Sequence, residues 1–101
     1  MYQSKIDTLM AELYTGKPCS QRYYLRHTLM FLSQHPEYLE GTAIAMCQAM
    51  RGTFPSYHGQ PVRYQHIYEV LRQCDIYLTS QGIVPGGTMA MLKTLMEKVV
   101  S

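Results

Sequence analysis

Apolar residues recur along most of the chain at the three- and four-residue spacing of one helical face. The first such segment lies near residues 4–15, where the spacing is i, i+3, i+4, i+7 and i+8. Its apolar positions are Ile6, Leu9, Met10, Leu13 and Tyr14. Ser4 followed by Asp7 resembles a capping box at the start of this helix. Gly16 and Pro18 end it.

Four further segments repeat the pattern, near residues 20–35, 37–51, 61–81 and 88–100. Ser20 is placed to cap the second, and Pro36 separates it from the third. Gly41 and Thr42 lower the helix propensity of the third segment. Pro61 suits the first turn of the fourth and longest helix. The inner face predicted for that helix consists of Ile67, Val70, Leu71, Cys74 and Leu78.

The last two segments are predicted to form a helical hairpin across the turn from Gly82 to Gly87. Gly82 stands where a left-handed residue ends a helix, with Ile83 placed for the accompanying apolar contact. Thr88 is placed to cap the last helix, whose apolar stripe should dock on the fourth helix through Leu92 and Leu95. The apolar positions of that stripe are Met91, Leu92, Leu95, Met96, Val99 and Val100. The pattern therefore predicts an all-α fold, a single compact bundle of about five short helices over residues 1–101.

Composition adds an expectation about self-association. Charged residues make up only 16% of the chain, against a usual share of about 25%. Eight methionines and nine tyrosines accompany this shortage of charge. Adaptable Met side chains and Tyr rings with a polar tip both suit protein interfaces. We expect a buried self-interface, and hence a homodimer.

The cysteine spacing, the N-terminal sequence and the length of the apolar runs indicate a cytoplasmic protein. Cys19, Cys47 and Cys74 are an odd number with no CxxC spacing, which fits free thiols better than a disulfide framework. The N-terminal sequence has no signal-peptide pattern, and no apolar run is long enough to span a membrane. No His or Cys pair has the i, i+3 or i, i+4 spacing of helical metal ligands, so we expect no metal and no cofactor.

No catalytic constellation emerges from the sequence, and a non-enzymatic role is expected. The scattered acids form no acid–base pair, and the Gly pair before Thr88 lacks the rest of a phosphate-binding motif. Cys19 precedes a predicted helix N-terminus, where the dipole can activate a thiol. A thiol-dependent enzyme using Cys19 is therefore a third hypothesis, without a His partner nearby in sequence.

The stretch GTFPSYHGQPVRYQH at residues 52–66 interrupts the helical pattern. It is longer than most connections between bundle helices and unusually aromatic for a solvated loop. Phe54 is expected to fold into the core. Tyr57, His58, Arg63 and Tyr64 are predicted to form a partner-binding surface, because Tyr and Arg are common anchors of interfaces.

A second surface gives an alternative function. No acid lies between Glu12 and Glu37, a window that contains Lys17, Arg22, Tyr23 and Arg26 on or just before the second predicted helix. Basic side chains beside Tyr suit phosphate contacts and base stacking. A solvated helix face explains the same pattern.

These observations favour a small cytoplasmic protein-interaction or regulatory protein that acts as a homodimer. The alternative is a small nucleic-acid-binding, transcriptional regulator that uses the basic and Tyr-bearing face of the second helix. A net charge of +2 does not by itself indicate a nucleic-acid partner.

Overall fold

A computed structural model describes residues 2–16, 19–55 and 59–101 of the chain. These residues form five α-helices and two short 3₁₀ helices, which confirms the predicted all-α bundle. The α-helices are α1 (Gln3–Leu13), α2 (Ser20–Gln34), α3 (Ala43–Met50), α4 (Tyr64–Ser80) and α5 (Thr88–Val100). The 3₁₀ helices are η1 (Pro36–Glu40) and η2 (Arg51–Thr53).

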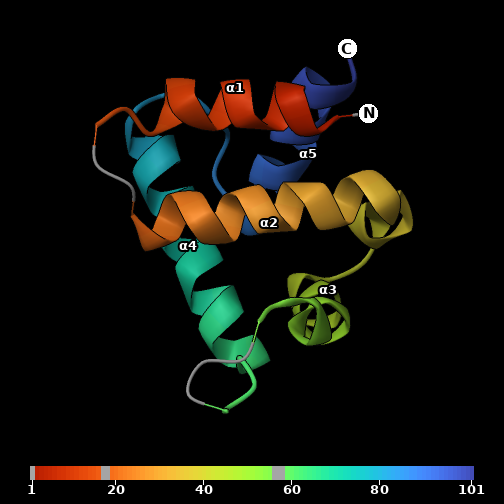
Figure 1. The fold of residues 1–101 in the computed structure, drawn as a ribbon. Helices are drawn as coiled ribbons and strands as arrows, with labels where there is room; N and C mark the ends of the chain where they lie inside the picture. The colour runs from red at the N-terminus through yellow and green to blue at the C-terminus, as the bar shows by residue number, and fades with distance from the viewer. Residues whose placement is uncertain (1, 17–18, 56–58) are drawn as a thin grey trace.

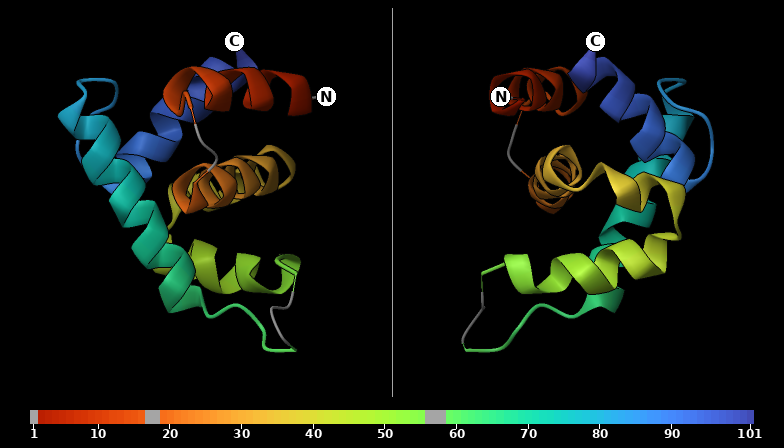
Figure 2. Two further views of the ribbon diagram at one scale, coloured as in Figure 1. Left: turned by 60° about the vertical axis from the view of Figure 1, so that its left-hand side comes forward. Right: turned by 90° about the vertical axis from the view of Figure 1, so that its right-hand side faces the viewer.

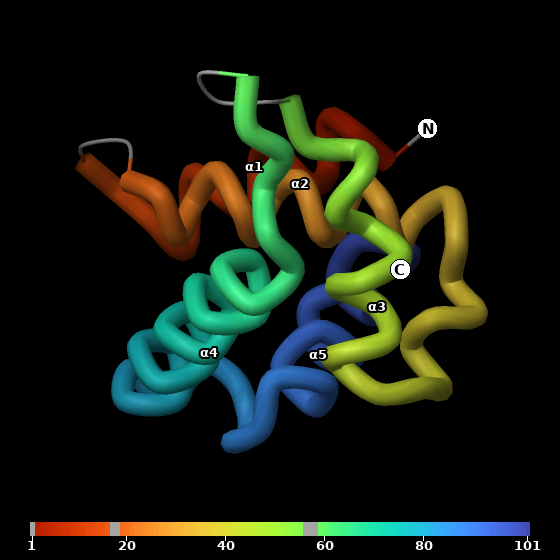
Figure 3. The backbone as a smooth tube through the Cα atoms, turned by 90° about the horizontal axis from the view of Figure 1, so that it is seen from below, coloured from red at the N-terminus to blue at the C-terminus, as the bar shows by residue number. Residues whose placement is uncertain are grey.

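The helices α1, α2 and α3 lie one below the other, and α4 runs across all three along one side (Figures 1 and 2). Helix α5 returns from the end of α4 and packs against α4, α2, α1 and η1. Seen from below, α3 lies beside the beginning of α4 (Figure 3), and it packs chiefly on that helix. Helix α2 is central, since it contacts α1, α4, α5 and η1.

The core is formed by the apolar faces that the spacing predicts. Each residue of the predicted inner face of α4 is buried. Leu92 and Leu95 of α5 are fully buried, on a helix that packs on α4 as predicted and also on α2. Two predicted positions differ, since Leu13 at the end of α1 is only half-buried and Val100, the last residue of α5, is 52% exposed. Phe54 is buried, as expected for the apolar ring of the 52–66 stretch.

The third predicted helix, near 37–51, is wrong as a single element. Pro36 opens the short 3₁₀ helix η1, which ends before Gly41, and α3 begins only at Ala43. Thr42 is extended, and its hydroxyl accepts the N–H of Ala45 at 3.1 Å. Thr42 would lower helix propensity inside a helix, but here it is the N-cap of α3. In that position its hydroxyl accepts a hydrogen bond from a backbone N–H that has no partner within the helix.

The fourth helix begins later than predicted. Pro61 does not start α4, because the chain is still extended at Arg63 (ψ 139°) and the helix begins at Tyr64. Pro61 therefore belongs to the connection that leads into α4.

The predicted caps of α1, α2 and α5 are also wrong. No side chain caps α1 or α5, so Ser4 and Thr88 do not act as expected. The cap of α2 is Cys19, whose sulfur accepts the N–H of Arg22, and Ser20 is the first helical residue.

The α4–α5 hairpin has the turn that the glycines predict. Gly82 is left-handed (φ +73°), and its N–H donates to the carbonyl of Thr79 at 3.0 Å. The N–H of Ile83 donates to the carbonyl of Leu78 at 3.1 Å, which completes the Schellman pattern. At the other end of the turn Gly87 (φ +112°) donates its N–H to the carboxylate of Asp75.

Candidate functional site

Two of the four predicted partner-binding residues line one groove. Arg63 is exposed and Tyr64 half-buried at the beginning of α4. Together with Arg51, Gly52 and the rest of residues 61–65 they border an open groove of about 390 Å³. Tyr57 and His58 lie outside the described residues. The groove lies where the end of α3 and η2 meets the start of α4, which packs on α3.

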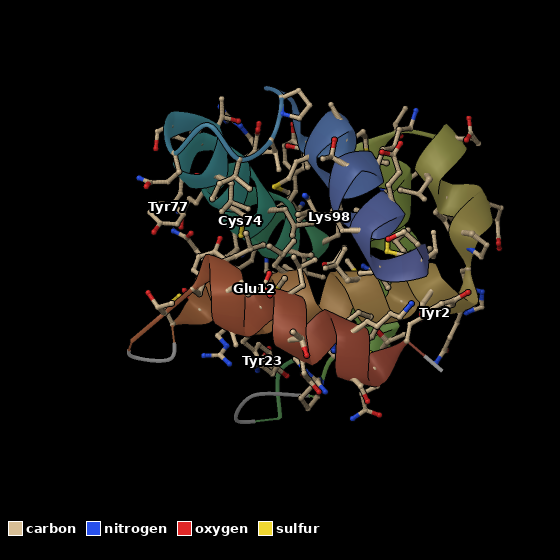
Figure 4. All side chains as sticks on the ribbon, turned by 90° about the horizontal axis from the view of Figure 1, so that it is seen from above. Tyr2, Glu12, Tyr23, Cys74, Tyr77 and Lys98 are labelled. Atoms are coloured by element: carbon tan, nitrogen blue, oxygen red, sulfur yellow. The ribbon has the colours of Figure 1, made fainter. Side chains whose placement is uncertain are left out.

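The groove carries charge of a single sign. Arg51 and Arg63 line it, and no acidic residue does. Within the described part of the chain, neither guanidinium forms a salt bridge. Two other hollows, one larger and one of similar volume, are lined by residues of both charges. The furrow of about 480 Å³ between α1 and α5 has Glu12 beside its lysines (Figure 4), and the hollow between η1 and α5 mixes Lys93 with two glutamates.

The predicted nucleic-acid-binding residues are largely engaged within the fold. The guanidinium of Arg26 forms a salt bridge with the carboxylate of Asp7 on α1. That hydrogen bond lowers the pKa of Asp7 below its usual range. Arg22 donates from Nη1 to the carbonyl of Tyr14 at 3.5 Å. Tyr23 is 48% exposed, and Lys17 lies outside the described residues. The charge of Arg26 is therefore compensated within the protein.

An aromatic cluster, which sequence reasoning missed, lies beside these residues. The ring of His27 stacks on Phe54 with 3.9 Å between centroids, and Tyr23 and Tyr24 also contact Phe54. The hydroxyl of Thr53 donates to the carbonyl of Met50, so it accepts the Nε2–H of His27 at 2.8 Å. Burial, with a smaller contribution from the charge of Arg26, lowers the pKa of His27. The cluster fixes the 52–54 segment to α2.

The cysteines show no reactive arrangement. All three are free thiols. Cys47 and Cys74 are buried, and burial raises the pKa of each thiol to about 11. Cys19 is exposed, and its sulfur serves as the cap of α2. Across residues 2–16, 19–55 and 59–101, no three metal-ligating side chains gather at one point.

An exposed apolar surface lies at the far end of α4. Ile76, Tyr77 and Ile83 are 61%, 40% and 37% exposed, and we refer to these three residues as the apolar tip. Figure 4 shows Tyr77 at the outer edge of α4, while Cys74 lies on its inner side. The ring of Tyr77 stacks on the ring of Tyr14, the residue that follows α1, with 5.5 Å between the two centroids. This contact holds the Tyr77 ring in one orientation.

The apolar tip has few charged neighbours along the chain, although the exposed Arg72 lies one helical turn before Ile76 on α4. Between Arg72 and Lys93 the only charged side chain in the sequence is Asp75. Its carboxylate accepts hydrogen bonds from Thr79 and from the backbone of Gly87. The tip therefore combines exposed apolar side chains with a border of polar residues that includes Arg72 and Asp75, as the centre and rim of a protein interface do.

No helix of the described residues is long and apolar enough to cross a membrane. Comparisons with protein-family models, with curated proteins and with solved structures gave no match to this chain.

Proposed function

We propose that this chain is a non-enzymatic protein-interaction protein that acts as a homodimer through the apolar tip. The observation that carries the proposal is the exposure of Ile76, Tyr77 and Ile83 in a segment, residues 73–92, whose one charged side chain is Asp75. Soluble monomers seldom leave contiguous apolar surface of this kind to water, and exposed patches mark interaction sites.

The choice of a second copy as the partner follows from symmetry and charge. In a two-fold dimer the same patch meets itself, so a patch whose charges all have one sign is repelled by its copy. The apolar tip avoids that repulsion, because the charged residues nearest to it, Arg72 and Asp75, have opposite signs and the carboxylate of Asp75 is hydrogen-bonded to the turn. The Arg51–Arg63 groove, by contrast, would repel its own copy.

The size of the tip sets the strength of the dimer. A stable interface buries about 800 Å² per partner, which is more than three side chains supply. The contact must therefore extend over neighbouring uncharged residues such as Gln73, Ser80 and Gln81, all of which are exposed. We expect a dimer with a Kd on the order of micromolar.

Size-exclusion chromatography with light scattering, run over a series of protein concentrations, measures this equilibrium. Wild-type protein should shift from monomer to dimer as concentration rises. Ile76→Lys should remain monomeric, because it places a charge at the centre of the interface, facing its own copy. The matched control is Ile44→Lys, since Ile44 is 40% exposed on α3 and the change in net charge is the same.

Ile44→Lys should dimerise like wild type. A wild-type chain that stays monomeric into the high micromolar range would overturn the homodimer. Equal loss of dimer in both variants would show that the effect comes from net charge and not from the apolar tip.

Two further features support the rest of the proposal. In the hollow beside His27 the imidazole Nε2 lies 2.8 Å from the hydroxyl of Thr53, but that hydroxyl donates its proton to the carbonyl of Met50 and is not activated by His27. The exposed thiol of Cys19 is used as a helix cap. Three free cysteines, two of them in the core, suit a reducing compartment such as the cytoplasm. A regulatory role is compatible with this chemistry, since it requires only binding.

Nucleic-acid binding through α2 has less support, because Arg26 is paired with Asp7 and Arg22 contacts the backbone of Tyr14. Tyr23 remains available for stacking. A mobility-shift assay at low salt with duplex and single-stranded DNA tests this alternative. Binding that weakens steeply with salt, and that Arg22→Gln reduces, would favour it over the protein-interaction proposal.

A further inference from the structure

We infer that the Arg51–Arg63 groove binds an acidic peptide segment of a partner protein. The groove is separate from the apolar tip, so the inference goes beyond the dimer and does not depend on it. Both ends of the groove are formed by connections that the helices hold in place. Arg51 begins η2 directly after α3, and Arg63 is the last residue before α4.

The chemistry of the groove matches a carboxylate-bearing chain. Its two guanidinium groups are exposed, and no acidic residue lines the groove. From residue 41 to residue 68 the sequence contains no acid, and among the residues that the structure describes no carboxylate forms a salt bridge with Arg51 or Arg63. Guanidinium groups form bidentate, charge-assisted hydrogen bonds with carboxylates, and these are among the strongest in proteins.

The remaining lining suits a peptide with apolar residues between its acids. Pro61 is exposed, while Val62 and Tyr64 are half-buried in the same wall. These side chains add apolar surface to the groove that the two cations line, and Tyr is a frequent anchor of peptide contacts. A volume of about 390 Å³ accommodates a few side chains of an extended segment.

A nucleic acid is a poorer match for this groove. Strong binding to a phosphate backbone needs a track of several cations, and its salt dependence grows with their number. Two arginines among apolar side chains form no such track. An acidic peptide is therefore the occupant that the lining residues favour.

The experiment is a fluorescence-anisotropy titration with a short labelled peptide of alternating glutamate and leucine. The same peptide with glutamine in place of glutamate reports apolar binding alone. A labelled single-stranded DNA oligonucleotide forms the third arm. We expect the glutamate peptide to bind, the glutamine peptide to bind at least about tenfold more weakly, and the oligonucleotide to bind more weakly than the glutamate peptide.

Variants assign the binding to the groove. Arg51→Gln/Arg63→Gln should bind the glutamate peptide at least about tenfold more weakly than wild type does. The double variant Arg72→Gln/Lys93→Gln changes the net charge equally at exposed positions outside the groove, and it should bind like wild type. Arg51→Glu/Arg63→Glu should no longer bind the glutamate peptide and should instead bind a matching peptide of alternating lysine and leucine, because the charge of the groove is reversed.

Binding of the lysine peptide by the charge-reversed variant also shows that this variant is folded. The inference is overturned if the two glutamine double variants weaken binding equally, or if the glutamate and glutamine peptides bind alike. It is also overturned if the oligonucleotide binds more tightly than the peptide and loses that binding in Arg51→Gln/Arg63→Gln. The Ile76→Lys protein should retain full peptide binding, so failure of the dimer and failure of the groove are separate results.

Discussion

Replacing Leu95 with alanine measures how much α5 contributes to the core. Leu95 is 0% exposed, in a helix that packs on α1, α2 and α4. Leucine exceeds alanine by three carbon atoms, and at about 0.8 kcal/mol for each the lost transfer free energy is roughly 2.4 kcal/mol. The cavity adds to this because packed helices close into it only in part. The total loss in free energy of unfolding should be about 3–5 kcal/mol.

Urea denaturation followed by far-ultraviolet circular dichroism gives the free energy of unfolding. With a slope of about 1–3 kcal/mol per molar urea, the Leu95→Ala midpoint should fall by roughly 1–5 M. Because a dimer adds concentration-dependent stability, the comparison belongs in the Ile76→Lys background. A domain of this size has a total stability of about 5–15 kcal/mol, so the variant should be close to unfolding at elevated temperature.

Val100→Ala is the matched control, since Val100 lies on the same helix and is 52% exposed. Its free energy of unfolding should stay within about 0.5 kcal/mol of the parent protein. If Leu95→Ala unfolds at the parent midpoint, then α5 is not part of the core and the reasoning is wrong. If instead Leu95→Ala keeps its stability but the otherwise wild-type chain no longer dimerises, α5 forms the interface in place of the apolar tip.

Two other predictions follow from groups whose pKa is shifted by burial. Burial lowers the pKa of His27, so the unfolded chain takes up this proton more readily. The contribution of neutral His27 to the free energy of unfolding should therefore be fully present above about pH 6.5 and decrease as the pH falls below that value. In His27→Gln the urea midpoint should depend less on pH below about pH 6.5. Burial raises the pKa of Cys47 and Cys74 to about 11 each, so near neutral pH a thiol reagent should label Cys19 alone until urea is added. Equal labelling rates for all three thiols in the folded protein would contradict the burial of two of them.

Much of the architecture could be predicted from the sequence, because burial imposes a helical period on apolar residues. The inner face of α4 and the turn at Gly82 are examples, and both depend only on local spacing and backbone preference. The third helix was mispredicted because Thr42 is compatible with two roles. As an interior residue it weakens a helix, and as an N-cap it starts one. Apolar spacing continues through residues 37–51 in either case, so it does not reveal the break.

The candidate surfaces were less accessible to sequence reasoning, because they depend on contacts between distant residues. The pairing of Arg26 with Asp7 joins α2 to α1 across nineteen positions, and it compensates one charge of the expected basic face. His27 meets Thr53 across twenty-six positions. Arg63, in contrast, could be nominated as a partner-binding residue because interface-type residues cluster in one loop, although Arg51, which lines the same groove, lies before that loop in the sequence.

The position of α3 means that a ligand bound in the groove affects how readily this helix unfolds locally. Helix α3 is short and packs chiefly on α4, so it has fewer supports than the helices grouped around α2. Such elements open separately from the rest of a protein, and their amide protons exchange with solvent sooner. Arg51 follows directly from α3, whereas Arg63 adjoins α4. A ligand held by both guanidinium groups therefore ties α3 to α4, and it slows amide exchange in a helix whose inner residues it does not touch.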